Sequence, residues 1–223
     1  MKRLFYLLAA AAFTACGSAT TLSVMTFNMR YDNPEDGADN WRFRRGRVAE
    51  VIASHGVDVF GTQELLANQL GDLKRLLPGY AAVGVGREDG AEAGEFSAVF
   101  YRRDRFTPLE SGTFWLSETP DVAGSKGWDG ACERVATWVV LHDREGGREF
   151  LFVNTHLDHV GQVARDEGVN LLRERIEALR GAGLERFKSA LCAAVAGSAP
   201  QVLLNAPTLQ HYRQGVAALA AHP

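Results

Sequence analysis

Short runs of alternating or wholly apolar residues, separated by turn formers, dominate the first 160 residues and predict a protein rich in β-strands. The clearest run is Phe150–His159, which places apolar side chains on both faces before it ends in polar groups, as strands buried on both sides do. Similar runs predict strands at 21–30, 57–63, 80–86, 95–102, 106–117 and 134–143, the last forming a hairpin with 148–156.

Three other stretches carry apolar residues at helical spacing and predict helices between these strands. The first helix is capped by Asn40 and reaches His55. The second covers 66–77 and stops at a Pro-Gly pair, and the third runs from about Val163 to Arg180. Strands with helices laid over them indicate an α+β protein.

Composition and charge narrow the class of partner. The 223 residues, of which 46% are hydrophobic and 23% charged, suit one globular domain. The net charge is −3, and no basic run is longer than Arg44-Arg45. Tight nonspecific binding to a nucleic-acid backbone is therefore not indicated, and a small or partly neutral phosphate ester fits better.

The first 16 residues have the three parts of an export signal: Lys2-Arg3, an apolar core and small residues before Cys16. The apolar core is too short for a membrane-spanning helix. We expect the protein to be exported, either anchored to a bacterial envelope through lipidated Cys16 or secreted. Cys132 and Cys192 remain in either case; they could pair, but their spacing does not demand it.

Three predicted strands end in polar residues that could face one site: Asn28, Glu64 and the Asn154–His159 group. Carboxylate and amide oxygens are the hard ligands that Mg²⁺ takes, with water and substrate phosphate completing its shell. Taken singly, Asn28 also reads as a strand-end cap and Glu64 as a residue that complements a helix dipole.

Together these stretches resemble the endonuclease/exonuclease/phosphatase superfamily, and the resemblance covers about 22–180. The matching motifs, in the family's order, are TFNMR at 26–30, VDVFGTQE at 57–64, GEFSAVFYR at 94–102, RVATW at 134–138 and VNTHLDH at 153–159. The resemblance implies a four-layer α/β/β/α fold, a β-sandwich of two sheets flanked by helices. It also implies metal-dependent hydrolysis of phosphodiester or phosphomonoester bonds, in a bacterial secreted or lipoprotein branch.

Position by position, the resemblance implies a metal site and a phosphate site. Asn28 and Glu64 would hold Mg²⁺, with Mn²⁺ as an alternative. His156 would contact the scissile phosphate and pass a proton, Glu95 would orient that imidazole, and Arg134 would bind the phosphate through its planar fork.

Four further residues are assigned to the site on the same resemblance. Asp158 is expected to take part in catalysis, and Arg30, Asn154 and His159 in substrate contacts. For Asp158 and His159 a salt-linked loop anchor remains an open alternative. The substrate class stays open between nucleic acid, a phospholipid headgroup and a sugar or inositol phosphate, and no protein partner is indicated.

The tail departs from the family. Residues 184–223 contain one acidic residue, Glu185, and lack the family's Gly-Asp-Phe-Asn and Ser-Asp-His motifs. We therefore expect 21–183 to be the N-terminal part of the domain, with its second half truncated, and the tail to be a divergent or frame-shifted ending. The function expected is a phosphoesterase with impaired catalysis; the alternative is a non-catalytic member that binds phosphate or metal.

Two other hydrolase classes fit less well. The THLDH segment is similar to part of the His-rich zinc motif of metallo-β-lactamases, but Asn154 stands where that motif has another His. A serine hydrolase would need a GxSxG elbow, which the sequence does not contain.

Overall fold

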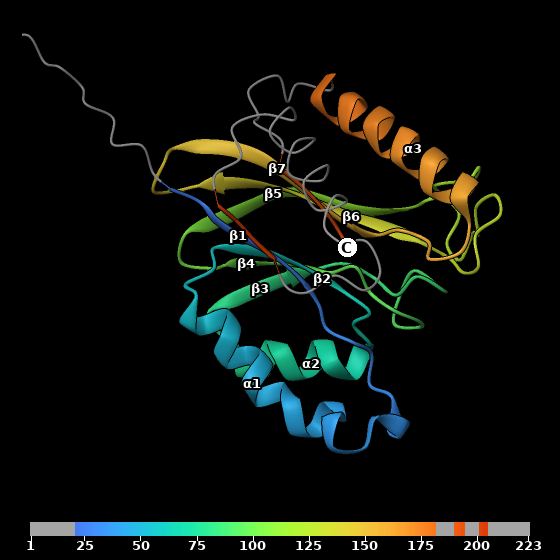
Figure 1. Cartoon of the computed structure of the whole chain (residues 1–223). Helices are drawn as coiled ribbons and strands as arrows, with labels where there is room; N and C mark the ends of the chain where they lie inside the picture. The colour runs from blue at the N-terminus through green and yellow to red at the C-terminus, as the bar shows by residue number, and fades with distance from the viewer. Residues whose placement is uncertain (1–20, 182–189, 195–200, 205–223) are drawn as a thin grey trace, which may run out of the picture.

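Two β-sheets packed face to face form the centre of the protein (Figure 1). The computed structural model describes residues 21–181, 190–194 and 201–204. In the first sheet the strand order is β3-β4-β2-β1-β9, with β1 and β2 parallel and the other pairs antiparallel. These strands are β1 (Ser23–Asn28), β2 (Val59–Gln63), β3 (Tyr80–Val83), β4 (Val99–Arg102) and β9 (Gln201–Leu204).

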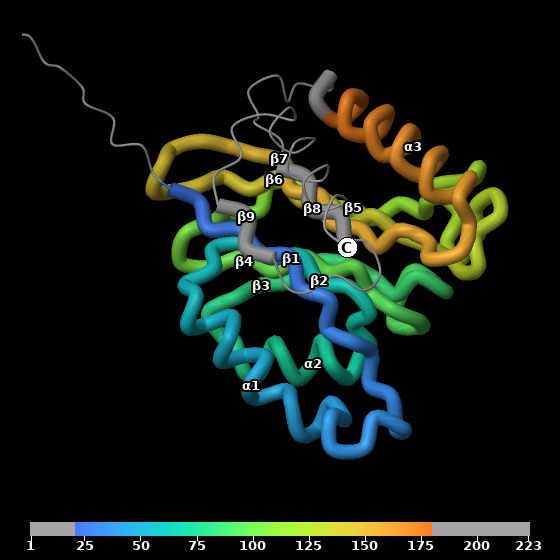
Figure 2. The backbone as a smooth tube through the Cα atoms, viewed as in Figure 1, coloured from blue at the N-terminus to red at the C-terminus, as the bar shows by residue number. Residues whose placement is uncertain are grey.

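The second sheet has the strand order β5-β6-β7-β8 and is antiparallel except for the parallel pair β7 and β8. Its strands are β5 (Phe106–Trp115), β6 (Val135–Asp143), β7 (Arg148–His156) and β8 (Ala190–Ala194). β9 pairs with β1, and β8 pairs with β7. The tube in Figure 2 shows β1 and β2 running side by side in the first sheet. The sequence pattern predicted no strand in the tail, whereas β8 and β9 extend both sheets.

Helices cover the outer faces, which gives the four-layer α/β/β/α sandwich that the sequence predicted (Figure 1). A short 3-10 helix, η1 (Pro34–Asp39), precedes α1 (Trp41–Ser54), and α1 and α2 (Ala67–Leu76) pack on the first sheet. The long α3 (Gln162–Gly181) packs on the second sheet through Leu172. The α+β prediction is confirmed.

Three hydrophobic clusters follow from this layering. One lies between the first sheet and its helices, with Trp41 and Phe60 fully buried in it. The second fills the space between the sheets, where Phe106 and Phe150 stack edge to face. The third lies under α3, where Leu172 is 2% exposed but Val169, which the helical spacing placed on the same stripe, is 49% exposed.

Asn154 of β7 joins the two sheets at one end of the sandwich. Its amide nitrogen donates to the Thr62 and Ala98 carbonyls of the first sheet, at 2.8 and 3.0 Å, and its oxygen accepts from Gln63 Nε2 at 2.8 Å. A Cβ on Gly61 would overlap this amide, so the close approach requires glycine there.

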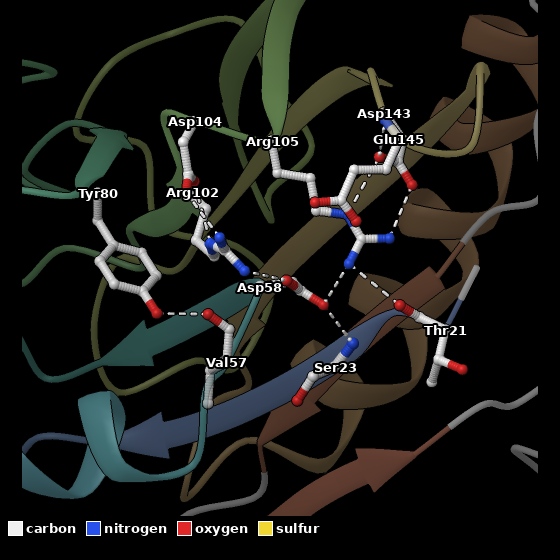
Figure 3. Close-up of polar contacts among 10 residues, drawn as sticks. All are labelled: Thr21, Ser23, Val57, Asp58, Tyr80, Arg102, Asp104, Arg105, Asp143 and Glu145. Atoms are coloured by element: carbon white, nitrogen blue, oxygen red, sulfur yellow. Dashed lines mark hydrogen bonds and ion pairs between the residues drawn. The ribbon is translucent and has the colours of Figure 1, made fainter.

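Arg105 joins the sheets at another point (Figure 3). Its buried guanidinium donates to Asp58, which precedes β2, at 2.7 Å, and through two nitrogens to Asp143 of β6 at 3.0 and 2.8 Å. Asp58 also accepts from the backbone nitrogen of Ser23 at 2.8 Å. One cation thus satisfies two buried carboxylates from different sheets.

The predicted export leader and Cys16 lie outside the described residues. Of the helices that the structure describes, none combines the length and apolar character needed to cross a bilayer.

Replacing Arg105 with Met is expected to lower the free energy of unfolding by about 3–5 kcal/mol, because it leaves Asp143 buried without its cation and Asp58 with only the weaker contact to Arg102 at 3.3 Å. Urea unfolding followed by circular dichroism measures the change. The matched control is Arg175→Met, which removes an ion pair to Asp121, a side chain that is 76% exposed; it should cost at most about 1 kcal/mol. Equal losses in the two variants would contradict the role given to Arg105.

Candidate active site

The parallel strands β1 and β2 bring the predicted metal pair together. Asn28 lies opposite Gln63 in the register, so Asn28 and Glu64 leave the sheet at the same edge. Asn28 Nδ2 donates to Glu64 Oε1 at 2.8 Å. Glu64 and Arg30 both adopt positive φ angles, 57° and 53°, which are uncommon for residues with a Cβ and occur often at functional sites.

The chain after β1 is held in place by residues that sequence reasoning missed. Gln69, fully buried on α2, donates to the Arg30 carbonyl at 3.0 Å and accepts from the backbone nitrogens of Asp32 and Leu66 at 3.2 and 2.9 Å. Arg44 donates to the Met29 and Arg30 carbonyls. The sequence did offer a signal for Gln69, because it is a polar residue at a buried position of the leucine-rich helix.

The donor set at this edge fits a hard divalent cation. Glu64 offers a carboxylate and Asn28 an amide oxygen, and within the described part of the chain no Lys, Arg or His is paired with Glu64. An anionic ligand without a competing side-chain cation suits Mg²⁺ or Mn²⁺, which would complete its shell with water and phosphate oxygens. These residues fit the metal that the sequence resemblance implies.

His156 ends β7 and is 5% exposed, and neither ring nitrogen has a hydrogen-bond partner among the described residues. Burial, and then the positive charge of Arg134, lower the pKa of His156 from 6.5 to about 4. The imidazole is therefore neutral at pH 7, with an unpaired lone pair and an unpaired N–H available to a ligand.

Arg134, at the start of β6, is fixed by the residues that follow β7. Its Nε donates to Asp158 Oδ2 at 3.3 Å, and Nη2 lies 2.9 Å from Nδ1 of the exposed His159. Arg134 itself is buried. Arg134 and His156 line one small cavity with Arg87, Glu95, Ser97, Glu133 and Val135.

Asp158 is a loop anchor in this structure. Its carboxylate accepts from the backbone nitrogens of Ala131, Val160 and Gly161 at 3.1, 2.9 and 2.8 Å, besides Arg134. Burial opposes ionisation, but these donors outweigh it and hold the pKa of Asp158 well below its usual range. With both oxygens engaged and 3% exposure, Asp158 matches the loop-anchor alternative rather than the catalytic assignment.

The same loop brings Cys132 near the anchor, but the arrangement does not suit a metal. Ligand atoms of Cys132, Asp158 and His159 lie within 4.8 Å of one another. The guanidinium of Arg134, however, already contacts both Asp158 Oδ2 and His159 Nδ1, which are the atoms that a metal would need. Cys132 is a free thiol.

Two other assignments need correction. Glu95 makes no hydrogen bond to His156; its Oε2 accepts from Arg87 Nη1 at 2.7 Å, and burial raises its pKa although Arg87 opposes the rise. Asn154 cannot contact substrate because its amide is buried between the sheets. Arg30 pairs with Asp36 at the surface, with 51% of its side chain exposed, and its assignment to substrate contacts stays a prediction.

Comparisons with known proteins agree with this arrangement. The family model described as "Endonuclease/Exonuclease/phosphatase family" matches residues 25–215. An endonuclease/exonuclease/phosphatase from Bacteroides vulgatus is 47% identical, with a TM-score of 0.72 over 73% of this chain and 62% of its own. A mannosyl-6-phosphatase from Bacteroides thetaiotaomicron is 44% identical, with a TM-score of 0.74 over 77% and 64%.

A curated relative is more distant. The CCR4-Not complex 3'-5'-exoribonuclease subunit Ccr4 of Aspergillus clavatus is 25% identical over 173 residues, which is 65% of this chain and 26% of that protein. The chain thus spans less than two thirds of the length of each of these three relatives.

The depressed pKa of His156 predicts a pH dependence of stability. The unfolded chain takes up a proton near pH 6.5 and the folded chain only near pH 4, so this contribution is present above pH 6.5 and is lost as the pH falls toward 4. The loss amounts to roughly 3 kcal/mol. Unfolding free energies of the wild type and His156→Phe, measured between pH 7.5 and 4 without metal or phosphate, give the difference.

The matched control is His142→Gln, since the His142 side chain is 37% exposed and lies on β6 away from the cavity. This control should follow the wild-type slope. If the His156→Phe curve runs parallel to the wild type across the window, the burial argument is wrong.

Proposed function

We propose that this chain, which belongs to the endonuclease/exonuclease/phosphatase family, is a Mg²⁺-dependent phosphoesterase with an impaired catalytic apparatus. The observation that carries the proposal is the proximity of the cavity lined by His156 and Arg134 to the carboxylate of Glu64. His156 is buried, has no hydrogen-bond partner among the described residues and lines a cavity with Arg134, and Glu64 acts on the pKa of His156. A cavity with these donors, next to a carboxylate that has no cationic partner in the described part of the chain, suits a phosphate that binds together with a cation.

In this proposal Asn28 and Glu64 would hold the metal, and a bound metal would supply neutralisation of the charge on the phosphate and the leaving oxygen. Arg134, fixed by Asp158, presents a rigid guanidinium to the phosphate oxygens. His156 donates a hydrogen bond to another oxygen. A dianion offsets the cationic field that depresses its pKa, so the imidazole can take up a proton when phosphate binds.

Relatives support hydrolysis of a phosphate ester but leave the substrate open. The mannosyl-6-phosphatase is named for a sugar phosphate and the Ccr4 subunit for RNA. The net charge of −3 favours the smaller ester. The exposed His159, next to Arg134, is in a position to contact the group attached to the phosphate. The leader supports export, with Cys16 as the proposed lipid attachment point.

The impairment is proposed from the carboxylates of this chain. The last Asp is Asp166 and the last Glu is Glu185, so residues 186–223 offer no carboxylate to activate water. General-base assistance is worth roughly 10²–10⁴ in rate. The alternative, binding of phosphate or metal without hydrolysis, rests on the same feature.

Purified protein is expected to hydrolyse p-nitrophenyl phosphate slowly, and only with Mg²⁺ or Mn²⁺. Glu64→Gln should reduce the metal-dependent rate by at least about 100-fold, because it removes the anionic ligand, and His156→Ala by a similar factor. The matched control is Glu110→Gln on the exposed part of β5. Metal-independent turnover that survives Glu64→Gln would contradict the proposal.

Replacing 184–223 with a family-type ending that contains both missing motifs should raise this rate by about 10²–10⁴. A matched graft with those Asp residues changed to Asn should give no gain. If the unmodified chain already turns over as fast as the grafted protein, the claim of impairment is wrong. Phosphate binding with no turnover in the unmodified chain would instead favour the binding-only alternative.

A further inference from the structure

Arg87, for which the sequence predicted no role, is a partly buried cation that lines the cavity of the candidate site. It lies between β3 and β4, and its side chain is 15% exposed. Its backbone is fixed on both sides: the nitrogen donates to the Glu95 carbonyl at 3.2 Å, and the carbonyl accepts from Trp115 Nε1 at 2.6 Å. Nη1 donates to Glu95 Oε2 at 2.7 Å.

One end of this guanidinium is left without an acceptor. Arg87 Nε is buried and has no hydrogen-bond partner among the described residues, and the same holds for both ring nitrogens of His156. Such groups are rare in native proteins because each costs the desolvation of a donor. Both side chains line the cavity that Arg134 also lines. Three donor side chains from three parts of the fold therefore meet at one small space.

Two guanidinium groups and two carboxylates line this space. Besides burial, Arg134 and Arg87 both lower the pKa of His156. Glu95 and Glu133 also line the cavity, but the Glu95 carboxylate is engaged by Arg87. Glu95 thus holds the Arg87 guanidinium in place, and the N–H of Arg87 Nε remains available to a ligand.

We propose that Arg87 is a second phosphate-binding residue, and that it selects phosphomonoester dianions over phosphodiester monoanions. The inference rests on the proposed function and names its substrate class. A phosphomonoester presents three terminal oxygens and two charges, which match three donor side chains and two guanidinium groups. A phosphodiester presents two terminal oxygens and one charge, so one donor would remain unsatisfied.

Calorimetric binding of phenyl phosphate and diphenyl phosphate to the full chain tests this selection without relying on turnover. Arg87→Gln is expected to weaken phenyl phosphate by about 10- to 100-fold, the usual effect of losing one charged hydrogen bond, and diphenyl phosphate by less than about 3-fold. The matched control is Arg103→Gln, since Arg103 is exposed and donates to the Tyr80 carbonyl outside the cavity; it should leave both affinities unchanged. Arg134→Gln should weaken both ligands.

The outcomes separate this inference from the function on which it rests. If the wild type binds phenyl phosphate and Arg87→Gln weakens both ligands equally, or neither, the selection by Arg87 is overturned while the phosphate site stands. If the wild type binds neither ligand, the proposed function falls as well. Should Arg87→Gln fail to fold, Arg87→Lys replaces it, with a loss of about 3- to 10-fold expected for phenyl phosphate alone; an equal loss for both ligands is again the contrary result.

Discussion

The amide of Asn154 fixes the geometry on which the candidate site depends. Its two donors and its acceptor are all used across the gap between the sheets, and glycine at position 61 lets the backbone come close enough. Gln63, its partner, directly precedes Glu64, and His156 follows Asn154 by two residues on the same face of the strand. One buried amide thus holds the proposed metal ligands and the proposed phosphate-binding side chains at a fixed separation.

The two sheets contribute different charges to the site. The first supplies the Glu64 carboxylate, which is negatively charged, and the neutral amide oxygen of Asn28. The second supplies His156 and Arg134, held by the loop that Asp158 anchors. In the proposed function a phosphate ester contacts both a metal and positive side chains, so neither sheet alone could bind it. The proposed function therefore depends on the packing of the sandwich.

Sequence patterns predicted the part of this structure that follows from periodicity. Alternation and helical spacing gave the strands and helices, the family resemblance implied the layer order, and strand ends pointed to Asn28 and Glu64. The failures were at residues whose hydrogen-bond partners periodicity does not reveal. Asn154 is polar at a strand end, which reads as exposed, but its partners on β2 and just before β4 bury it. Glu95 lies where an acid could orient His156, yet Arg87, eight residues earlier, takes its carboxylate.

The central claim is that side chains from both sheets form one phosphate-binding site. Diffraction with heavy-atom probes tests this claim most directly. Crystals of the chain soaked with Mn²⁺ and tungstate, a phosphate mimic, would locate both ions by anomalous scattering. The account predicts manganese at Glu64 and Asn28. It also predicts tungstate in the cavity, with its oxygens within hydrogen-bonding distance of His156, Arg134 and Arg87. Tungsten bound elsewhere, with this cavity empty at saturating concentration, would contradict it.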